Sequence, residues 1–431
     1  MSLAAAWAAP AAALPSFAQQ TGEPCARCHV GAYGPQLKQY GRDFKLFGYA
    51  AGDGKNVLPP IALTAIASYT QTRADRAQQR HFGPNDNAAF QSAIMAYAGR
   101  LWGGAGAFAE AFYDGVHQKL SLSRVDVRRT FTGTVAGHDV VWGLDANNRP
   151  GVQDIWNSTP VFEFSAFSSP FAATPQVSPL MDGRLATRVA GAGGYAMWDD
   201  TLYTEAAVYE PLDRVLLSRV GVATAATADR YSGALPYWRV ALQHEFADTH
   251  YLEVGAYGLT ARRFPSGIRT AGEDRLTDVG LDATYQYIGS KRRYLASHVT
   301  WIRETERLDA SHRLTGARAS DRLDSYRADA IYSVDDTWTP AAEVFRTNGT
   351  RDPKFFRTPD GSPDSTGYVV ELAYAPWGKT SSPVTWANLR LTARWVGYTR
   401  FNGRSAGASA NDTLFLGVNM AVAPLGGLVK R

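Results

Sequence analysis

The sequence predicts a mainly β protein, an antiparallel transmembrane β-barrel of about 16 strands preceded by a small N-terminal segment. Three observations predict this fold class. From about residue 61 onward, segments of roughly ten residues alternate apolar and polar side chains. Short and long connections between these segments follow one another along the chain. Aromatic residues make up 12% of the 431 residues and charged residues only 19%, below the roughly 25% of an average soluble protein.

The composition excludes several other classes of protein. The net charge is +4 and no dense basic cluster is present, which argues against a nucleic-acid partner. A chain with 45% hydrophobic residues can bury a large core, so intrinsic disorder is excluded. No apolar run long enough for a membrane-spanning helix follows the N-terminus, which excludes a helical membrane protein.

Residues 1–13, MSLAAAWAAPAAA, resemble the apolar region and small-residue cleavage site of a secretory signal peptide. A cut after Ala11-Ala12-Ala13 fits this interpretation. No Lys or Arg precedes the apolar stretch, and the first basic residue is Arg27. We therefore expect a signal peptide whose basic start is truncated or misassigned, and the alternative is a disordered Ala/Pro tail.

Both cysteines of the chain fall in one motif, Cys25-Ala26-Arg27-Cys28-His29, which has the C-x-x-C-H spacing of c-type haem attachment. In this chemistry each thiol binds one haem vinyl group, and the adjacent histidine is the proximal iron ligand. A redox disulfide would require a thioredoxin-like βαβ context, and a zinc knuckle would require a second pair of ligands. We predict one covalently bound haem c, held by Cys25 and Cys28 with His29 on the iron.

Residues 14–60 form the predicted c-type haem domain. A segment of this length cannot build a core of its own, so it needs the covalent haem and contact with the rest of the chain. Its apolar residues Leu37, Tyr40, Phe44 and Phe47 recur at near-helical spacing, which predicts an amphipathic helix packed on the haem. We expect this segment to plug the barrel lumen.

The distal iron ligand is not defined by the sequence. Small c-type cytochromes use Met or His, and residues 30–80 contain neither. Candidates farther along the chain are His81, Met95, His117, Met181, Met197 and His298. An open coordination site is the alternative. No cluster of Asp, Glu and His at metal-ligand spacing indicates a separate iron site.

Residues 61–431 are the predicted outer-membrane porin-like barrel, and the alternation assigns the two faces of its strands. In 385–400, for example, Leu391 and Trp395 lie on one face while Arg390 and Arg394 lie on the other. A soluble β-rich domain would alternate as well and is the structural alternative. Short turns are predicted at Gly103-Gly104, Asp199-Asp200, Asp248-Thr249, Gly289-Ser290 and Asp335-Asp336. Long connections are predicted at 72–89, 146–183, 211–234, 262–275, 305–322, 348–365 and 401–411.

These connections also predict how the barrel lies in the cell outer membrane. Bacterial barrels have short periplasmic turns and longer extracellular loops, so the haem segment is expected to enter from the periplasm. The connection 146–183 is long enough to fold into the lumen as a constriction. Lumen charges that could attract a small cation, or simply be solvated there, are Glu245, Glu253, Asp278, Asp282, Arg239, Arg327 and Arg394.

Two stretches resemble the fused monohaem cytochrome–porins of iron-oxidising bacteria. One runs from Pro15 to Tyr49 and includes PSFAQQTGEPCARCH and GRDFKLFGY, and the other is VWGLDANNRPGVQDIWNSTP, from Val141 to Pro160. Elsewhere the similarity concerns only length and strand number. The resemblance implies a periplasmic haem domain, a 16-stranded barrel, and one-electron oxidation of extracellular Fe(II) or another reduced metal donor. It also implies a periplasmic cytochrome c or cupredoxin as the electron acceptor.

The sequence therefore predicts an oxidoreductase embedded in outer-membrane lipid. Two other functions remain open. One is a diffusion porin whose haem segment acts as a redox-gated plug, and the other is an electron outlet that reduces external acceptors.

Overall fold

The computed structural model describes residues 14–52, 59–78, 81–162, 164, 168–222, 230–290, 293–384 and 386–424. The predicted signal peptide, residues 1–13, lies outside the described residues. No helix among the described residues is long and apolar enough to cross a membrane.

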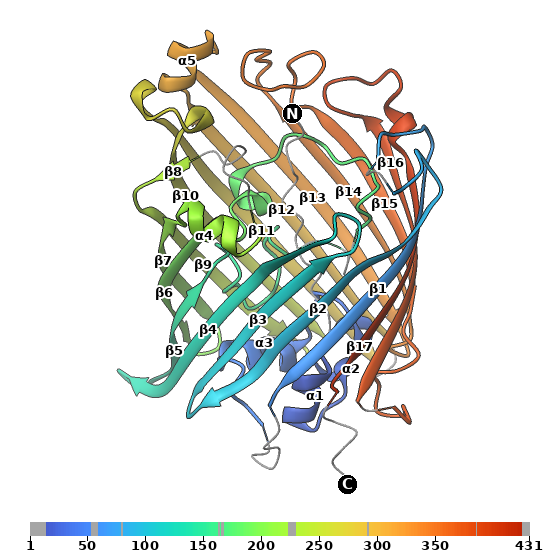
Figure 1. The fold of residues 1–431 in the computed structure, drawn as a ribbon. Helices are drawn as coiled ribbons and strands as arrows, with labels where there is room; N and C mark the ends of the chain where they lie inside the picture. Colours follow the sequence, from blue (N-terminus) through green and yellow to red (C-terminus); the bar gives the residue numbers. More distant parts are fainter. Residues whose placement is uncertain are drawn as a thin grey trace.

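The strands form one closed antiparallel barrel (Figure 1). The sheet closes because β1 pairs with both β2 and β17. The barrel strands are β1 (Ile61–Thr72), β2 (Asn87–Trp102), β3 (Ala105–Asp114), β4 (Lys119–Val135), β5 (His138–Asn147), β6 (Val189–Trp198), β7 (Leu202–Pro211), β9 (Leu235–Phe246), β10 (His250–Phe264), β11 (Asp274–Ser290), β12 (Arg293–Arg307), β13 (Ser320–Val334), β14 (Trp338–Gly349), β15 (Ser365–Tyr374), β16 (Ala387–Arg400) and β17 (Thr413–Val422). A further short strand, β8 (Arg230–Ser232), pairs only with the end of β10. The predicted barrel of 16 antiparallel strands is confirmed.

Apolar side chains cover the outside of the barrel and polar side chains face the lumen. In β16, Leu391 and Trp395 are exposed on the outer face, whereas Arg390 and Arg394 are buried in the interior. This arrangement follows from the two-residue period of a strand, which sends neighbouring side chains to opposite faces. The predicted assignment of faces is therefore confirmed for this strand.

The two ends of the barrel differ in the length of their connections (Figure 1). At the short-turn end, Asp199-Asp200 and Asp335-Asp336 adopt positive φ angles, as two-residue hairpin turns require. The predicted turns at Gly103-Gly104 and Asp248-Thr249 also lie here, whereas Gly289-Ser290 are the last residues of β11. The structure adds a turn at Ala136-Gly137 and one longer connection, residues 375–386. The remaining long connections lie at the other end, the long-loop end.

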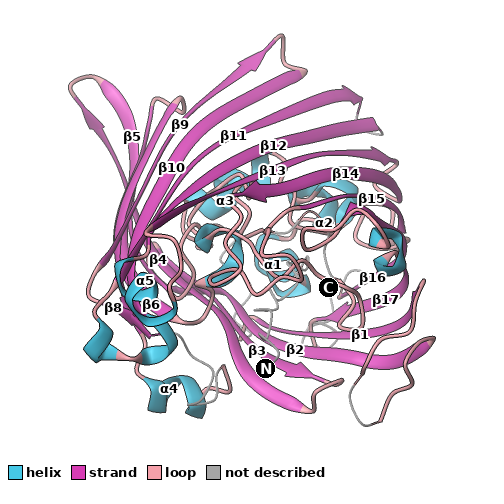
Figure 2. Cartoon of the chain, turned by 90° about the horizontal axis from the view of Figure 1, so that it is seen from above, coloured by secondary structure: helices cyan, strands magenta, loops and turns pink. Residues whose placement is uncertain are grey.

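The short helices of the N-terminal segment lie inside the ring of strands, at the short-turn end (Figure 2). They are α1 (Pro15–Thr21), α2 (Cys25–Cys28), the 3₁₀ turn η1 (Val30–Ala32) and α3 (Gln39–Leu46). Hydrogen bonds join the segment to the barrel wall: Arg42 donates to Gln286 Oε1 over 2.6 Å, and the Tyr49 hydroxyl donates to Asp126 over 2.6 Å. These bonds fix the segment against opposite sides of the interior.

The connection between β5 and β6 also turns inward. The Met181 backbone N–H donates to the lumen carboxylate of Asp278 over 2.8 Å, and Tyr398 on β16 donates to the Ala173 carbonyl over 2.8 Å. The connection includes the π-helical turn η2 (Leu180–Arg184). Its described residues therefore occupy the lumen, as the length of the predicted loop suggested. The other connections carry α4 (Arg214–Arg219), η3 (Pro265–Gly267), η4 (Arg269–Ala271), α5 (Asp309–Thr315) and η5 (Ala408–Asn411).

A buried charge network joins this inner loop to the wall. The Arg239 guanidinium lies 2.8 Å from Asp282, 2.9 Å from Glu253 and 3.8 Å from Asp154 of the loop. All four side chains are buried. Because a buried charge is stable only when it is paired, the contact of Arg239 with Asp154 ties the loop to the barrel wall.

Candidate cofactor-binding cavity

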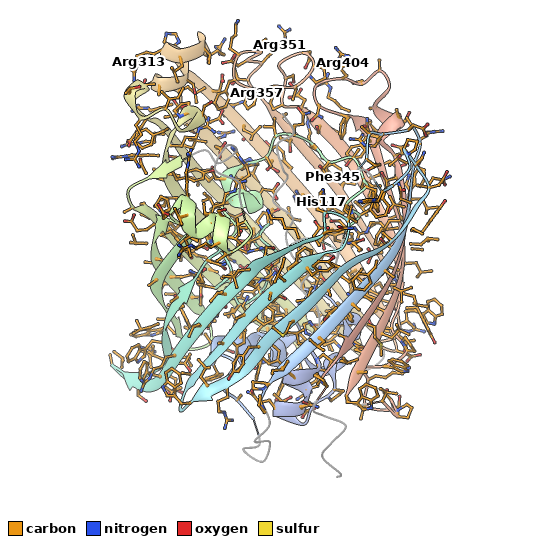
Figure 3. The ribbon with its side chains drawn as sticks, in the orientation of Figure 1. His117, Arg313, Phe345, Arg351, Arg357 and Arg404 are labelled. Atoms are coloured by element: carbon orange, nitrogen blue, oxygen red, sulfur yellow. The ribbon has the colours of Figure 1, made fainter. Side chains whose placement is uncertain are left out.

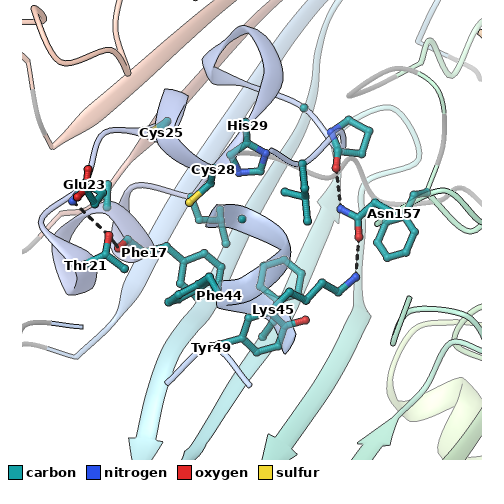
Figure 4. A pocket seen from close by; sticks show the side chains of 18 of the residues that line it. Phe17, Thr21, Glu23, Cys25, Cys28, His29, Phe44, Lys45, Tyr49 and Asn157 are labelled. Carbon is teal, nitrogen blue, oxygen red and sulfur yellow. Dashed lines mark hydrogen bonds between the residues drawn. The ribbon is translucent and has the colours of Figure 1, made fainter. Parts of the chain in front are cut away.

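A cavity lies between the N-terminal segment and the barrel wall (Figure 4). The N-terminal segment contributes most of the lining, strands β3 and β4 contribute Phe108 and Arg124, and the inner loop contributes Val152, Asn157 and Phe162. Three parts of the chain that are far apart in sequence thus enclose one space.

Cys25 and Cys28 both line this cavity, at the two ends of the single helical turn α2. Residues three apart in a helix lie on the same face, so the C-x-x-C spacing presents the two thiols together. Burial raises the pKa of Cys25 to about 11 and that of Cys28 to about 12, so both thiols are protonated at neutral pH. They are unpaired cysteines rather than a disulfide.

His29 lines the same cavity, in the extended backbone that follows α2. Its Nδ1 atom is buried and has no hydrogen-bond partner among the described residues. Burial lowers the pKa of His29 to about 4, so the imidazole is neutral, which is the form that binds a metal. Most buried polar atoms in proteins have a hydrogen-bond partner, and this nitrogen is an exception.

The position of the motif depends on a close approach by α3. A Cβ atom on Gly41 would lie only 2.6 Å from the Cys28 carbonyl oxygen, so only glycine allows this contact. The Lys38 N–H donates to that same carbonyl over 2.8 Å, and His29 forms a β-bridge with Leu37. The start of α3 therefore holds the C-x-x-C-H turn from one side.

Aromatic rings form the apolar wall of the cavity. The Phe17 ring lies 4.9 Å from Phe44 and 5.7 Å from Tyr49, and these three side chains pack with Phe108 of β3. Cys25 packs against the same cluster. The predicted apolar stripe of α3 is only partly present, because Phe44 and Leu37 line the cavity while Tyr40 and Phe47 do not.

A lysine and an asparagine form the polar side of the cavity. Lys45 Nζ donates to Asn157 Oδ1 over 2.6 Å and to the Asp154 carbonyl, and it lies 4.2 Å from the Phe162 ring centre. The Asn157 amide donates to the Pro35 carbonyl over 2.6 Å. Burial, reinforced by the nearby Arg128, lowers the pKa of Lys45. An ammonium group has three N–H donors, so an anionic group in the cavity would find a donor and a compensating charge here.

Sequence reasoning did not identify Lys45 and Asn157 as site residues. They lie 112 positions apart, and neither belongs to a recognised motif. One signal in the sequence pointed to them: Lys45 lies in the stretch Pro15–Tyr49, and Asn157 lies in the stretch Val141–Pro160. The two stretches that resemble one family are the two that meet at this cavity.

None of the six candidate distal ligands lines the cavity. Met95 is on the outer face of the barrel with 56% of its surface exposed, so it cannot reach the interior. This position excludes Met95 as a distal iron ligand. His298 is buried in the lumen and its Nδ1 lies 2.9 Å from Asp329. The other candidates are in other surroundings: His81 and His117 are exposed in connections at the long-loop end, Met181 is packed with the inner loop, and Met197 is packed in a separate core cluster.

The residues of the cavity fit a c-type haem. Two thiols and one neutral imidazole with a buried unpartnered nitrogen line a mainly apolar cavity, and this donor set is the one that c-type haem requires. No group of three or more His, Cys, Asp and Glu side chains within the described ranges could hold a metal ion by itself.

The fold defines the class of protein. A closed barrel with an apolar outer face satisfies all of its backbone hydrogen bonds without water, so it is suited to lie in a membrane. The 16-stranded antiparallel form with short turns at one end is that of bacterial outer-membrane barrels. The chain is an outer-membrane β-barrel protein, and the soluble alternative is excluded.

No family model and no curated protein matches this chain. Solved structures of outer-membrane proteins are similar to it at low sequence identity. Salmonella typhi OmpF, in complex with daunomycin, is 13% identical over 84% of this chain and 96% of that chain, with a TM-score of 0.48. An anion-selective porin from Comamonas acidovorans is 12% identical over 84% of this chain and 98% of that chain, with a TM-score of 0.43. OmpT of Vibrio cholerae is 11% identical over 84% and 96%, with a TM-score of 0.44.

Proposed function

We propose that this protein is an outer-membrane c-type cytochrome–porin that accepts one electron from extracellular Fe(II), or another reduced metal donor, and passes it to a periplasmic cytochrome c or cupredoxin. The observation that carries the proposal is that Cys25, Cys28 and His29 line one mainly apolar cavity inside the barrel. The resemblance to the fused cytochrome–porins supports iron(II) as the donor.

The residues of the cavity have distinct roles in this proposal. Cys25 and Cys28 hold one haem c through thioether bonds, and His29 binds the iron. Haem c supplies a one-electron carrier that alternates between the ferric and ferrous states. Lys45 and Asn157, at the polar side of the cavity, bind the haem carboxylates and stabilise their charge. The rings of Phe17, Phe44 and Phe108 exclude water.

The position of the cavity determines how the partners would approach. It lies at the short-turn end, which faces the periplasm in bacterial barrels. A separate recess at this end includes Asp43, Asp139 and Asp200, and we propose it as the region where a basic periplasmic carrier docks. A donor from outside would approach from the long-loop end.

The experiment that tests this proposal is visible absorption of the oxidised, detergent-purified protein mixed anaerobically with Fe(II). Sharp bands of reduced c-type haem should appear promptly, and the Cys25→Ala and His29→Ala variants should lack them. Haem that dithionite reduces but Fe(II) does not, at acidic and neutral pH, would instead favour an electron outlet. Absence of covalent haem would overturn the proposal.

Lys45→Met provides a sharper test of the carboxylate site. Removing a cation beside the haem should stabilise the oxidised state and lower the reduction potential, because a nearby positive charge favours the added electron. Lys379→Met is the matched control, since Lys379 lies at the same end of the barrel but donates to Thr337 outside the cavity. If wild type, the Lys45 variant and the control variant had equal reduction potentials, Lys45 would not be part of the proposed haem site.

The second candidate function is a diffusion porin with a redox-gated haem plug. The closed 16-stranded barrel favours it, because barrels of this size enclose an aqueous channel. Solute flux into liposomes that contain the protein, measured with the haem oxidised and reduced, distinguishes the two functions. Flux that changes with the redox state would favour the porin, and flux that is absent in both states would favour the electron carrier.

A further inference from the structure

A row of three arginines lies across adjacent strands near the long-loop end of the barrel. Arg262 on β10 is the direct pairing partner of Arg275 on β11, and Arg275 is the partner of Arg307 on β12. Directly paired residues point to the same face of a sheet, and neighbouring strands are about 4.8 Å apart. The three side chains therefore form one row about 10 Å wide.

This row faces outward. The three arginines are exposed, while the residues that flank them along each strand, such as Ala261, Leu276 and Glu306, are buried on the lumen side. Within the described residues, no ion pair joins any of the three to a carboxylate. Like charges in directly paired positions destabilise a sheet, so the row is unfavourable unless an anion compensates it.

The surroundings place this row above the membrane surface. Six residues below Arg307 on the same strand, Trp301 pairs with Tyr326 on the outer face, and Val299 below it is 55% exposed in the apolar band. Aromatic residues mark the interface of a barrel with the lipid headgroups. At about 3.4 Å per residue and a tilt of about 40°, the row lies about 15 Å above this girdle.

Two more arginines bridge the gap between the aromatic girdle and the row. Arg303 and Arg322 lie 2.9 Å and 3.1 Å from the same carboxylate, that of Asp324. One carboxylate cannot neutralise two guanidinium groups, so this triad carries a net positive charge. The positive surface therefore extends from the level of the headgroups outward.

We propose that Arg262, Arg275 and Arg307 form a binding site for the phosphate groups of lipopolysaccharide, the phosphorylated glycolipid of the outer leaflet. Guanidinium groups bind phosphate oxygens with two parallel hydrogen bonds, which suits a fixed row of arginines better than a diffuse charge. The site is continuous with the lipid-facing band and is independent of the proposed haem function. The lipid would offset the repulsion within the row and hold this side of the barrel in the leaflet.

The test is titration of delipidated protein in non-ionic detergent with lipopolysaccharide, followed by microscale thermophoresis. The variant Arg262→Gln/Arg275→Gln/Arg307→Gln should bind more weakly by about fivefold for each arginine, or about a hundredfold in total. The control is Arg351→Gln/Arg357→Gln/Arg404→Gln, which removes the same charge from the connections at this end (Figure 3). Wild-type affinity in the control and loss in the row variant would support the proposal.

Equal losses in both variants would overturn the site, because they would indicate diffuse attraction by the whole extracellular end. Chemically dephosphorylated lipopolysaccharide should bind wild type as weakly as the intact lipid binds the row variant. If inorganic phosphate at millimolar concentration competed fully with the lipid, the site would be one for a soluble anion rather than for the glycolipid.

A stability measurement separates binding from a structural role. In lipid-free detergent, Arg275→Gln should melt at the same temperature as wild type or higher, because it removes the central repelling charge. Adding lipopolysaccharide should raise the melting temperature of wild type more than that of the variant. A variant that melts lower than wild type without lipid would show that Arg275 stabilises the fold and would overturn the proposal.

Discussion

Gly41 lies where α3 passes closest to the C-x-x-C-H turn. In an ordinary helix Gly→Ala is stabilising by about 1 kcal/mol, but here the new Cβ would meet a backbone oxygen at 2.6 Å. We expect Gly41→Ala to destabilise the docked segment by about 1–3 kcal/mol and to lower the fraction of chains with covalent haem. In-gel haem staining and proteolysis of the segment measure both effects.

The matched control is Gly133→Ala on β4, where a Cβ would meet nothing within 4 Å. If Gly133→Ala reduced haem attachment as much as Gly41→Ala, the contact between α3 and the motif would not be the cause.

Asp43 makes the docking of α3 dependent on pH. Burial, aided by the nearby Asp200 and opposed by Arg42, raises the pKa of Asp43 to about 6 from its ordinary value of 3.8. Between these values the docked state binds more protons than the released state, so docking should weaken as pH rises from about 4 to about 6. Hydrogen exchange of α3, corrected for intrinsic rates, measures this change.

Asp43→Asn cannot ionise and should remove the pH dependence in this window. A variant that kept the same slope would assign the dependence to another group.

The sequence indicated which residues would hold the proposed haem but not which other residues line the cavity. C-x-x-C-H is local, so Cys25, Cys28 and His29 could be named from spacing alone. Met95 could not be excluded, because whether a strand residue faces lipid or lumen depends on the register of the whole strand. Lys45 and Asn157 meet only after the inner loop folds into the barrel, which no local pattern predicts.

At the scale of elements, the segment 149–162 of the inner loop depends on Asp154. Its carboxylate accepts hydrogen bonds from the backbone N–H groups of Trp156, Ser158 and Thr159 at 2.8–2.9 Å. Asp154→Ala would leave three buried donors unpaired, each costing about 1–3 kcal/mol. We expect this part of the loop to release from the cavity and chymotrypsin to cleave after Trp156, which is buried in the native protein.

Asp213→Ala is the control, because Asp213 caps α4 through the Val215 N–H in a different connection. Cleavage after Trp156 in both variants would indicate general loosening of the barrel rather than release of this loop.

Strand elements were predictable and connections less so. Strands carry a two-residue period over many residues, whereas the Ala136-Gly137 turn has a short signal that is easily missed. The connection 375–386 is long although it lies at the short-turn end. It has a structural role there, because the Gly378 carbonyl accepts a hydrogen bond from the Ala26 N–H over 2.8 Å.

At the scale of the whole molecule, the pairing that closes the barrel is made without the segment in its interior. The β1–β17 pairing that closes the barrel involves no residue of the N-terminal segment. A protein that lacks residues 14–52 should therefore still form a barrel, with a wider lumen and a severalfold higher single-channel conductance in planar bilayers. Heat-modifiable migration on gels checks that the barrel has formed.

Equal conductance with and without the segment would mean that the inner loop alone limits the channel. The Asp154→Ala substitution, combined with the deletion, then gives the variant in which conductance should rise.

The attachments of the N-terminal segment impose an order on assembly of the protein. Lys38 pairs with Asp336, 298 positions later, and the Ala32 carbonyl accepts a hydrogen bond from Asn388, 356 positions later. The segment leaves the inner membrane first but cannot dock until the last strands are present. In the finished barrel the two thiols are only partly exposed and face the cavity between the segment and the wall. An enzyme that attaches the proposed haem would therefore have the freest access to both thiols before the last strands pair, and a delay in that attachment would leave the barrel to close around an unoccupied cavity.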